Sequence, residues 1–325
     1  MKEILALTPP ASPARVDAAE RGELTVALVQ HRWHENPQAL RGELEDGIRR
    51  AAAQGAKIVY LPELTLSKYP AFAVPTPDAA DESAEDLDNG PTVAFARDMA
   101  ARYLIHVHIS LFRKAPAADG LGLNTAVVVS PEGEIVALTN KLHIPRTAGY
   151  YEDKYFREGP NDDPYPVHRI EELNGLAMGL PTCWDEWFSE PPRIYSLAGA
   201  DLVAYPTAIG SEPDHPDFDT EPLWRQTIIG NGIANGLFMV VPNRWGDEGA
   251  LTFYGSSFIS DPYGRVLARA PRDESAVLVA TLDLDARRDW LTLFPFLRTS
   301  RPETYGALTE ARAESGLGEM GRSHV

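Results

Sequence analysis

The sequence is short of cysteine, of long apolar runs and of positive charge. Its 325 residues include one cysteine, Cys183, so no disulfide can form within the chain, and a reducing, cytoplasmic setting is expected. No apolar run reaches the ~18 residues that a membrane span needs. Lys and Arg number 30 against 47 Asp and Glu, and the resulting net charge of -17 argues against binding to nucleic acid or to anionic membranes.

The rest of the composition is that of a folded globular protein. Hydrophobic residues make up 44% of the chain, and a chain of this length can bury the core of one large domain or of two ordinary ones. Residues 1–22 do not resemble a signal peptide, and we expect them to form a flexible arm before a main domain at 23–284. The tail, 285–325, carries Trp290, Phe294 and Phe296, which we expect to pack across a subunit interface.

Patterning along the first half predicts alternating strands and helices. The apolar runs at 24–29 and 58–61 are typical of buried strands. Between them, Asn36 and Pro37 predict a helix N-terminus, and Gly55 predicts its end. The turn residues 131–133 predict a hairpin between two further strands.

The second half repeats this order some 130 to 150 residues later. Residues 199–206 echo 55–62, and a predicted helix at 221–235 matches one that begins at Pro91. We therefore expect an α/β fold of two similar halves whose sheets pack face to face in a four-layer αββα sandwich. A doubly wound open sheet is the structural alternative, although no glycine-rich phosphate loop follows the first strand.

Three reactive side chains each follow a predicted strand. Glu63, Lys141 and Cys183 would meet at one rim of the two halves, where ligands of open α/β sheets tend to bind. Together they form a sufficient set for acyl transfer: a thiol nucleophile, a carboxylate base and a cation for the oxyanion. A helix N-terminus at Cys183 would also favour the thiolate. Taken singly, each has an ordinary alternative: a buried structural cysteine, a solvated glutamate and a surface lysine.

The stretches around these residues resemble the three signature blocks of the nitrilase, or carbon–nitrogen hydrolase, superfamily. The blocks are 62–64 (PEL), 140–145 (NKLHIP) and 183–188 (CWDEWF), and they occur in order with suitable spacing. The resemblance runs from about Leu24 to Tyr305. Within the superfamily the chain is most similar to the N-carbamoylputrescine amidases, and 149–152, 205–213 and 253–258 support that likeness.

This resemblance implies an αββα sandwich, a homodimer or higher homo-oligomer, and no metal or other cofactor. It implies that Cys183 is the nucleophile, Glu63 the general base and Lys141 the oxyanion stabiliser. Glu152 matches the family's second glutamate, which orients the lysine and the substrate. Pro181, two residues before the cysteine, departs from the pattern and fits only if its position forms no ladder hydrogen bond.

The residues after the cysteine bear on the substrate. Glu186 would repel a carboxylate and suit an ammonium group, with Trp184 or Trp187 adding cation–π attraction. The alternative is that Glu186 faces solvent at a helix start, where an acid is favoured. Tyr69 completes the set of expected substrate contacts.

The expected function is thus that of a thiol amidohydrolase that cleaves a non-peptide C–N bond of a small molecule. An N-carbamoyl amine such as N-carbamoylputrescine is the first expectation, and β-ureidopropionase, aliphatic amidase or nitrilase activities are alternatives. A Cys183–His143 dyad is a rival catalytic arrangement. A metal site at His106 and His108 lacks a third ligand at a recognisable spacing, and a catalytically silent scaffold on this fold is the non-enzymatic alternative.

Overall fold

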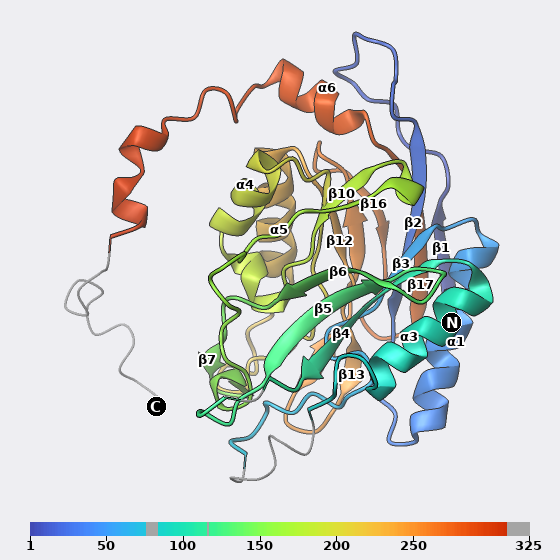
Figure 1. Cartoon of the computed structure of the whole chain (residues 1–325), viewed down its shortest axis with the longest axis vertical. Coiled ribbons are helices and arrows are strands. Elements are labelled where there is room, and N and C mark those ends of the chain that lie inside the picture. The colour runs from blue at the N-terminus through green and yellow to red at the C-terminus, as the bar shows by residue number, and fades with distance from the viewer. Residues whose placement is uncertain (76–83, 116, 311–325) are drawn as a thin grey trace.

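The computed structural model describes residues 1–75, 84–115 and 117–310, and these build four layers. Two β-sheets pack face to face, and Figure 1 shows helices α1 and α3 on one flank and α4 and α5 on the other. This is the predicted αββα sandwich, with an order of strands and helices that confirms the two similar halves. The main helices are α1 (Pro37–Ala53), α3 (Pro91–Tyr103), α4 (Glu190–Leu197), α5 (Glu221–Asn235) and α6 (Ala286–Leu293).

The first sheet has seven strands in the order β1-β17-β2-β3-β4-β5-β6. Its central strands β2, β3 and β4 run parallel, and β5 and β6 continue as an antiparallel hairpin. The strand bounds are β1 (Lys2–Ala6), β2 (Glu23–Gln30), β3 (Ile58–Tyr60), β4 (His106–Arg113), β5 (Leu123–Val129), β6 (Ile135–Asn140) and β17 (Ala276–Asp283).

The second sheet has six strands in the order β16-β15-β12-β11-β10-β9, with β10, β11 and β12 parallel. Its strands are β9 (His168–Ile170), β10 (Leu176–Gly179), β11 (Leu202–Ala204), β12 (Phe238–Val241), β15 (Phe258–Ser260) and β16 (Val266–Arg269). Because β10 ends at Gly179, Pro181 lies beyond the ladder and removes no strand hydrogen bond. Two short hairpins lie outside the main sheets: β7 (Arg146–Thr147) with β8 (Tyr150–Tyr151), and β13 (Trp245–Asp247) with β14 (Thr252–Tyr254).

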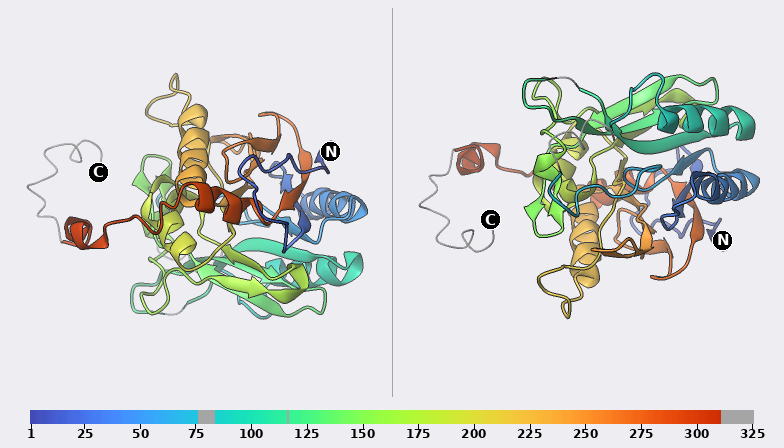
Figure 2. Two further views of the ribbon diagram at one scale, coloured as in Figure 1. Left: turned by 90° about the horizontal axis from the view of Figure 1, so that it is seen from above. Right: turned by 90° about the horizontal axis from the view of Figure 1, so that it is seen from below.

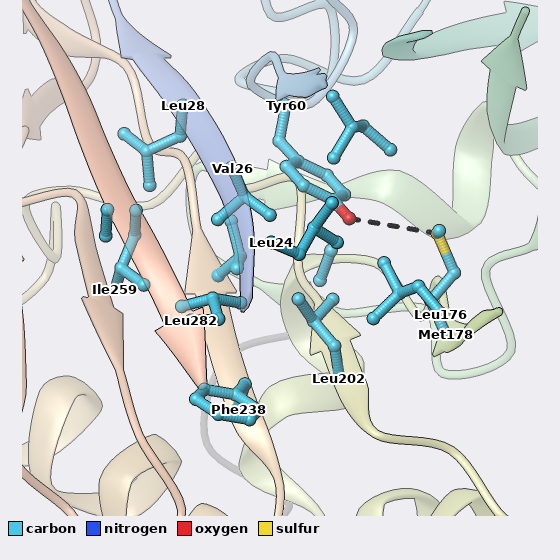
Figure 3. Close-up of a cluster of buried hydrophobic side chains, with 14 of the residues drawn as sticks. Leu24, Val26, Leu28, Tyr60, Leu176, Met178, Leu202, Phe238, Ile259 and Leu282 are labelled. Atoms are coloured by element: carbon cyan, nitrogen blue, oxygen red, sulfur yellow. Dashed lines mark hydrogen bonds between the residues drawn. The ribbon is translucent and has the colours of Figure 1, made fainter. Parts of the chain in front are cut away.

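The core between the sheets follows from the two-residue period of the strands. Along β2, Val26 and Leu28 point to the second sheet, whereas Ala27 and Val29 point to the helices. Figure 3 shows Val26 and Leu28 among side chains from β10, β11, β12, β15 and β17. Tyr60 reaches across this layer, and its hydroxyl lies 3.8 Å from the sulfur of Met178.

The helices cover the outer faces with their apolar sides. Leu40, Leu44 and Ile48 of α1 pack with α3 on the first sheet. Trp224 and Ile228 of α5 pack on the second. As predicted, Asn36 caps α1, since its side-chain oxygen accepts hydrogen bonds from the backbone N–H groups of the next turn.

The N-terminal arm differs from its prediction. Residues 2–6 are not loose but form β1, which pairs in parallel with β17. Further along, Arg15 donates to Asp289 at 2.8 Å and to Asp283 at 2.6 Å, so the arm is fastened to the end of the domain. The pairing of β1 joins positions more than 270 residues apart, which no local pattern can reveal.

The first part of the tail packs on the domain of the same chain. The indole of Trp290 donates to the backbone oxygen of Ile233 at 2.9 Å and lies against Tyr263. Residues 301–310 are exposed, and Figures 1 and 2 show the chain leading away from the sandwich after α6. The rest of the expected tail, 311–325, lies outside the described residues. In the part of the chain that the structure describes, no helix is both long and apolar enough to cross a membrane.

The packing of the central layer predicts the effect of truncating Leu28, which is fully buried. Replacing Leu28 with alanine should lower the free energy of unfolding by about 2–5 kcal/mol, because the sheets on both sides prevent the cavity from closing. Leu7→Ala is the control, since Leu7 is 44% exposed, and its effect should stay within about 0.5 kcal/mol. Urea unfolding measures both, and equal effects would contradict this description of the core.

Candidate active site

A pocket of about 410 Å³ opens at the rim of the sandwich and contains Cys183. Its lining comes from four stretches: the β7–β8 hairpin and the residues around it, the turn after β10, the segment after β11, and the loop before α5. The lining residues are Pro145, Thr147, Ala148, Tyr150, Glu152, Cys183, Trp184, Trp187, Ile209, Glu212, Pro213, Asp214, His215 and Thr220.

Cys183 begins a short 3-10 helix, η3 (Cys183–Trp187), just after β10. Its backbone is left-handed, with φ of +44°, a conformation that costs a non-glycine residue free energy and must be held by its surroundings. Two hydrogen bonds hold it: the N–H of Cys183 donates to the oxygen of Pro206 at 3.1 Å, and the N–H of Thr182 donates to Asp185 at 2.9 Å. The cysteine is 6% exposed.

Beside the cysteine, Lys141 bridges two buried carboxylates. Its ammonium group donates to Glu63 at 2.9 Å and to Glu152 at 2.6 Å, and all three side chains are 0–1% exposed. Asn124 donates to the same oxygen of Glu63 at 2.7 Å, and the hydroxyl of Tyr69 donates to the free oxygen of Glu152 at 2.8 Å. The structure thus brings Glu63, Lys141 and Cys183 together at one rim, as the sequence predicted, and adds Glu152, which the resemblance implied.

One oxygen of Glu63 remains available. Oε2 of Glu63 is buried and has no hydrogen-bond partner among the described residues. Burying a carboxylate oxygen without a hydrogen-bond partner lowers the stability of the fold, and such groups often have a catalytic role. Here it can accept a proton from a thiol or from water.

The charges around the site shift its pKa values. Burial alone would lower the pKa of Lys141, but the negative charges of Glu152 and Glu63 outweigh it and raise that pKa well above the usual value. Burial raises the pKa of Glu152 to about 7. For Cys183, burial and then the charge of Glu63 raise the pKa well above 9.0, although Lys141 opposes them.

Burial and the charge of Glu63 thus favour the thiol of Cys183, against the thiolate expected at a helix N-terminus. The helix that starts at Cys183 is a single 3-10 stretch of five residues, so it supplies little dipole. Desolvation by burial, and then the charge of Glu63, dominate instead. A base must take the proton as the sulfur attacks.

The expected substrate contacts divide into two groups. Trp184 and Trp187 line the pocket, with ring centroids 6.4 Å apart. Tyr69 does not line it but lies behind Glu152, which it holds by its hydroxyl. Glu186 neither lines the pocket nor faces solvent: it is fully buried and accepts a hydrogen bond from the indole of Trp224 at 2.7 Å.

The arrangement of the histidines does not support the alternative chemistries. Nδ1 of His143 lies 2.7 Å from Asp185, and its ring stacks on Phe188 at 3.9 Å, which does not favour a dyad with Cys183. His108 is buried against Tyr60. Within the described ranges, no group of three or more His, Cys, Asp or Glu side chains is placed to hold a metal ion.

A buried arginine that the sequence pattern did not predict supports the site. Arg244 is fully buried, and its guanidinium group donates to the backbone oxygens of Glu63 at 2.7 Å and Leu64 at 3.1 Å. Its partner Glu248 accepts from Arg244 at 2.8 Å and from the N–H of Tyr69 at 3.1 Å. The ion pair of Arg244 and Glu248 holds the turn that carries Glu63. The only sequence signal for this pair is that two charged residues occur close to apolar stretches.

The acidic part of the pocket lining was missed as well. Glu212, Asp214 and His215 lie in the loop between β11 and α5, and Glu212 belongs to a stretch that the resemblance had already marked. Burial raises the pKa of Glu212 above its usual value. Loop residues follow no helical or strand period, so their side chains cannot be assigned to the pocket from the sequence.

An αββα sandwich with a buried thiol beside two glutamates and a lysine is the arrangement of a thiol hydrolase. Comparison of the sequence with protein-family models identifies the particular family. The family model for carbon–nitrogen hydrolases matches residues 25–291. The chain therefore belongs to the carbon–nitrogen hydrolase family, within the nitrilase superfamily, and it is an enzyme.

Named relatives agree with this assignment. A citrullinase of Francisella tularensis is 33% identical over 87% of this chain and 96% of its own length. An N-carbamoylputrescine amidase of Arabidopsis thaliana is 32% identical over 89% of this chain and 96% of its own.

Solved structures show the same fold. A carbon–nitrogen hydrolase from Helicobacter pylori superposes with a TM-score of 0.77 at 28% identity, covering 90% of this chain and 100% of that one. A mutant amidase from Nesterenkonia sp. AN1, with acrylamide added at its active-site cysteine, has a TM-score of 0.68 at 25% identity, covering 88% and 99%.

The raised pKa of Cys183 predicts how the native protein reacts with iodoacetamide. The alkylation rate should keep rising with pH beyond 9.0, because burial and Glu63 disfavour the reactive thiolate. Mass spectrometry reads the reaction directly, since Cys183 is the only cysteine. The urea-unfolded chain is the control and should titrate near 9.0. A midpoint in the native protein below that value would contradict the resting thiol.

Proposed function

We propose that the protein hydrolyses an N-carbamoyl amine whose far end carries an ammonium group, with N-carbamoylputrescine as the model substrate. The observation that carries this proposal is the character of the pocket. Its lining holds Glu212 and Asp214 together with Trp184 and Trp187, and no lysine or arginine occurs among the lining residues of the described chain. Acidic and aromatic side chains attract an ammonium group and disfavour a substrate with only a carboxylate.

The named relatives support the same substrate class. Their names denote enzymes for citrulline and for N-carbamoylputrescine. Each of these compounds carries a ureido group at one end of an alkyl chain and an amine at the other. Citrulline also carries a carboxylate, for which the described lining offers no permanent cation.

In the proposed first half-reaction, Oε2 of Glu63 takes the thiol proton as the sulfur of Cys183 attacks the ureido carbon. The oxyanion that forms is held by the ammonium of Lys141 and by the backbone N–H of Trp184. The C–N bond to the terminal nitrogen then breaks. That nitrogen takes the proton from Glu63 and leaves as ammonia, and an S-carbamoyl thioester remains.

In the second half-reaction, Glu63 takes a proton from water, and the resulting hydroxide attacks the thioester carbon. The C–S bond breaks, and the leaving sulfur takes that proton from Glu63, which restores both the thiol and the carboxylate base. The carbamate product then decomposes to amine and carbon dioxide. Glu152 orients Lys141 throughout, a role supported by the 2.6 Å contact between them and by its second contact with Tyr69.

Two further expectations remain proposals. The single cysteine suits a cytoplasmic location. The exposed apolar side chains Leu293 and Phe294 at the end of α6 suit packing against a second copy of the chain, and a monomeric elution profile in gel filtration would contradict that.

The pocket acids provide the test of the substrate class. We expect Asp214→Asn and Glu212→Gln each to raise KM for N-carbamoylputrescine about three- to tenfold with little change in kcat, because each removes one attraction for the ammonium group. Their effect on N-butylurea, which lacks that group, should be within about twofold. Ammonia release measures turnover, Cys183→Ala sets the background, and Asp98→Asn, an exposed acid on α3, is the matched control.

The outcomes separate the substrate classes. Equal losses for the charged and uncharged ureides would contradict an ammonium site at these acids. Cysteine-dependent turnover of only N-carbamoyl-β-alanine, a simple aliphatic amide or a nitrile would discard the substrate class but keep the thiol mechanism.

A further inference from the structure

Glu186 is a buried carboxyl group without a cation. It lies three residues after Cys183 and is fully buried. Its Oε1 accepts from the indole N–H of Trp224 at 2.7 Å, and its Oε2 lies 3.4 Å from the hydroxyl of Thr207. No lysine, arginine or histidine of the described chain forms an ion pair with it, whereas Glu63 and Glu152 share Lys141.

The hydroxyl of Thr207 lies within reach of two oxygen atoms but has only one hydrogen. Its hydroxyl oxygen lies 2.9 Å from the backbone oxygen of Tyr205 and 3.4 Å from Oε2 of Glu186. A hydroxyl has one hydrogen to donate, and a backbone oxygen can only accept. The shorter contact therefore takes the hydrogen of Thr207, and its oxygen faces Oε2 of Glu186 with lone pairs. With the hydrogen of Thr207 on the shorter contact, a hydrogen on Oε2 of Glu186 would complete the longer one.

We propose that Glu186 is a neutral carboxylic acid that positions Cys183, donating to Thr207 through Oε2 and accepting from Trp224 through Oε1. The proton chain runs from Glu186 to Thr207 and from Thr207 to the oxygen of Tyr205. This inference uses the proposed role of Cys183 as the nucleophile but does not depend on which substrate the enzyme hydrolyses.

The network acts on Cys183 through the segment that follows β11. The oxygen of Pro206, between Tyr205 and Thr207, accepts the N–H of Cys183 at 3.1 Å. The N–H of Thr207 donates to Pro242 at 2.9 Å, so this segment is tied to the end of β12 as well. The contact of Glu186 with Thr207 therefore links the residue three positions after Cys183 to the segment whose Pro206 oxygen binds the N–H of Cys183. This link supports the strained left-handed turn at Cys183.

The surrounding charges favour the neutral form. The titratable groups that act on or respond to Glu186 are Glu63, Lys141, Cys183, Tyr205 and Tyr254. Burial raises the pKa of Glu186 well above its usual value, and the charge of Glu63 adds to this, against the hydrogen bond from Trp224, the charge of Lys141 and the contact with Thr207. A negative charge on Glu186 would oppose both the thiolate and the oxyanion. A neutral acid gives the same hydrogen bonds without that charge.

Glutamine is the sharp test, because its amide has the shape and hydrogen-bonding capacity of the neutral acid but cannot ionise. We expect Glu186→Gln to keep kcat/KM and its pH profile within about threefold of wild type, and Glu186→Leu to lose about tenfold or more, mainly in kcat. Activity in the glutamine variant as low as in the leucine variant, or a shifted pH profile, would overturn the proposal.

Infrared difference spectroscopy reads the proton directly and needs no substrate. The wild-type minus Glu186→Gln spectrum near neutral pH should contain the C=O stretch of a protonated carboxylic acid, with a shift in D₂O. Bands of an ionised carboxylate in its place would overturn the proposal. In Thr207→Val the acid band should move to higher frequency, because its acceptor is gone, and an unmoved band would overturn the contact with Thr207.

The two proposals can fail separately. Silence of the wild-type enzyme on every ureido compound would remove the proposed function and leave the acid band in place. Loss of the acid band with normal turnover would remove the role of Glu186 and leave the function.

Discussion

The site depends on one buried interaction: the ammonium group of Lys141 between the carboxylates of Glu63 and Glu152. Taking three charges out of water is costly, and one cation compensates two acids only in part. The remaining cost appears as the raised pKa values of Glu152 and Cys183. Such perturbed groups in a pocket are typical of a catalytic centre, where a proton must move easily between neighbours.

The fold supplies the rigidity that this cluster requires. Glu63 follows β3, Lys141 follows β6 and Cys183 follows β10, so both sheets contribute to one rim. Two of the turns are left-handed, at Leu64 and Cys183, with φ of +50° and +44°. Arg244 holds the first through backbone oxygens, and the segment at Pro206 holds the second. Strain at both turns is thus carried by buried hydrogen bonds from outside the catalytic set.

Much of the fold and the cluster could be predicted because their signals are local. The buried strands have short apolar runs, α1 has its capping asparagine, and each reactive residue lies just past a strand. The pairing of β1 with β17 could not be predicted, because strand partners far apart in sequence leave no periodic trace.

Glu186 shows a second limit of the sequence. A glutamate at the start of a helical segment usually faces water, and only its contacts with Trp224 and Thr207 reveal a buried acid. The pocket acids Glu212 and Asp214 were hidden for another reason, since they lie in a loop without a period. For Glu186 the deciding partners, Thr207 and Trp224, lie 21 and 38 residues further along the chain.

The most direct test of this account is the kcat of Lys141→Ala with the ureido compound that the wild-type enzyme hydrolyses fastest. We predict a fall of about a hundredfold or more, because the variant lacks the cation proposed to hold the oxyanion. Lys114→Ala, at an exposed lysine, is the matched control. Thermal unfolding of Lys141→Ala and Lys114→Ala shows whether either variant has lost stability. Lys141→Arg, which keeps the positive charge, is measured beside them, so that a loss of activity can be separated from a loss of folding. A folded Lys141→Ala enzyme with near-normal kcat would contradict the account.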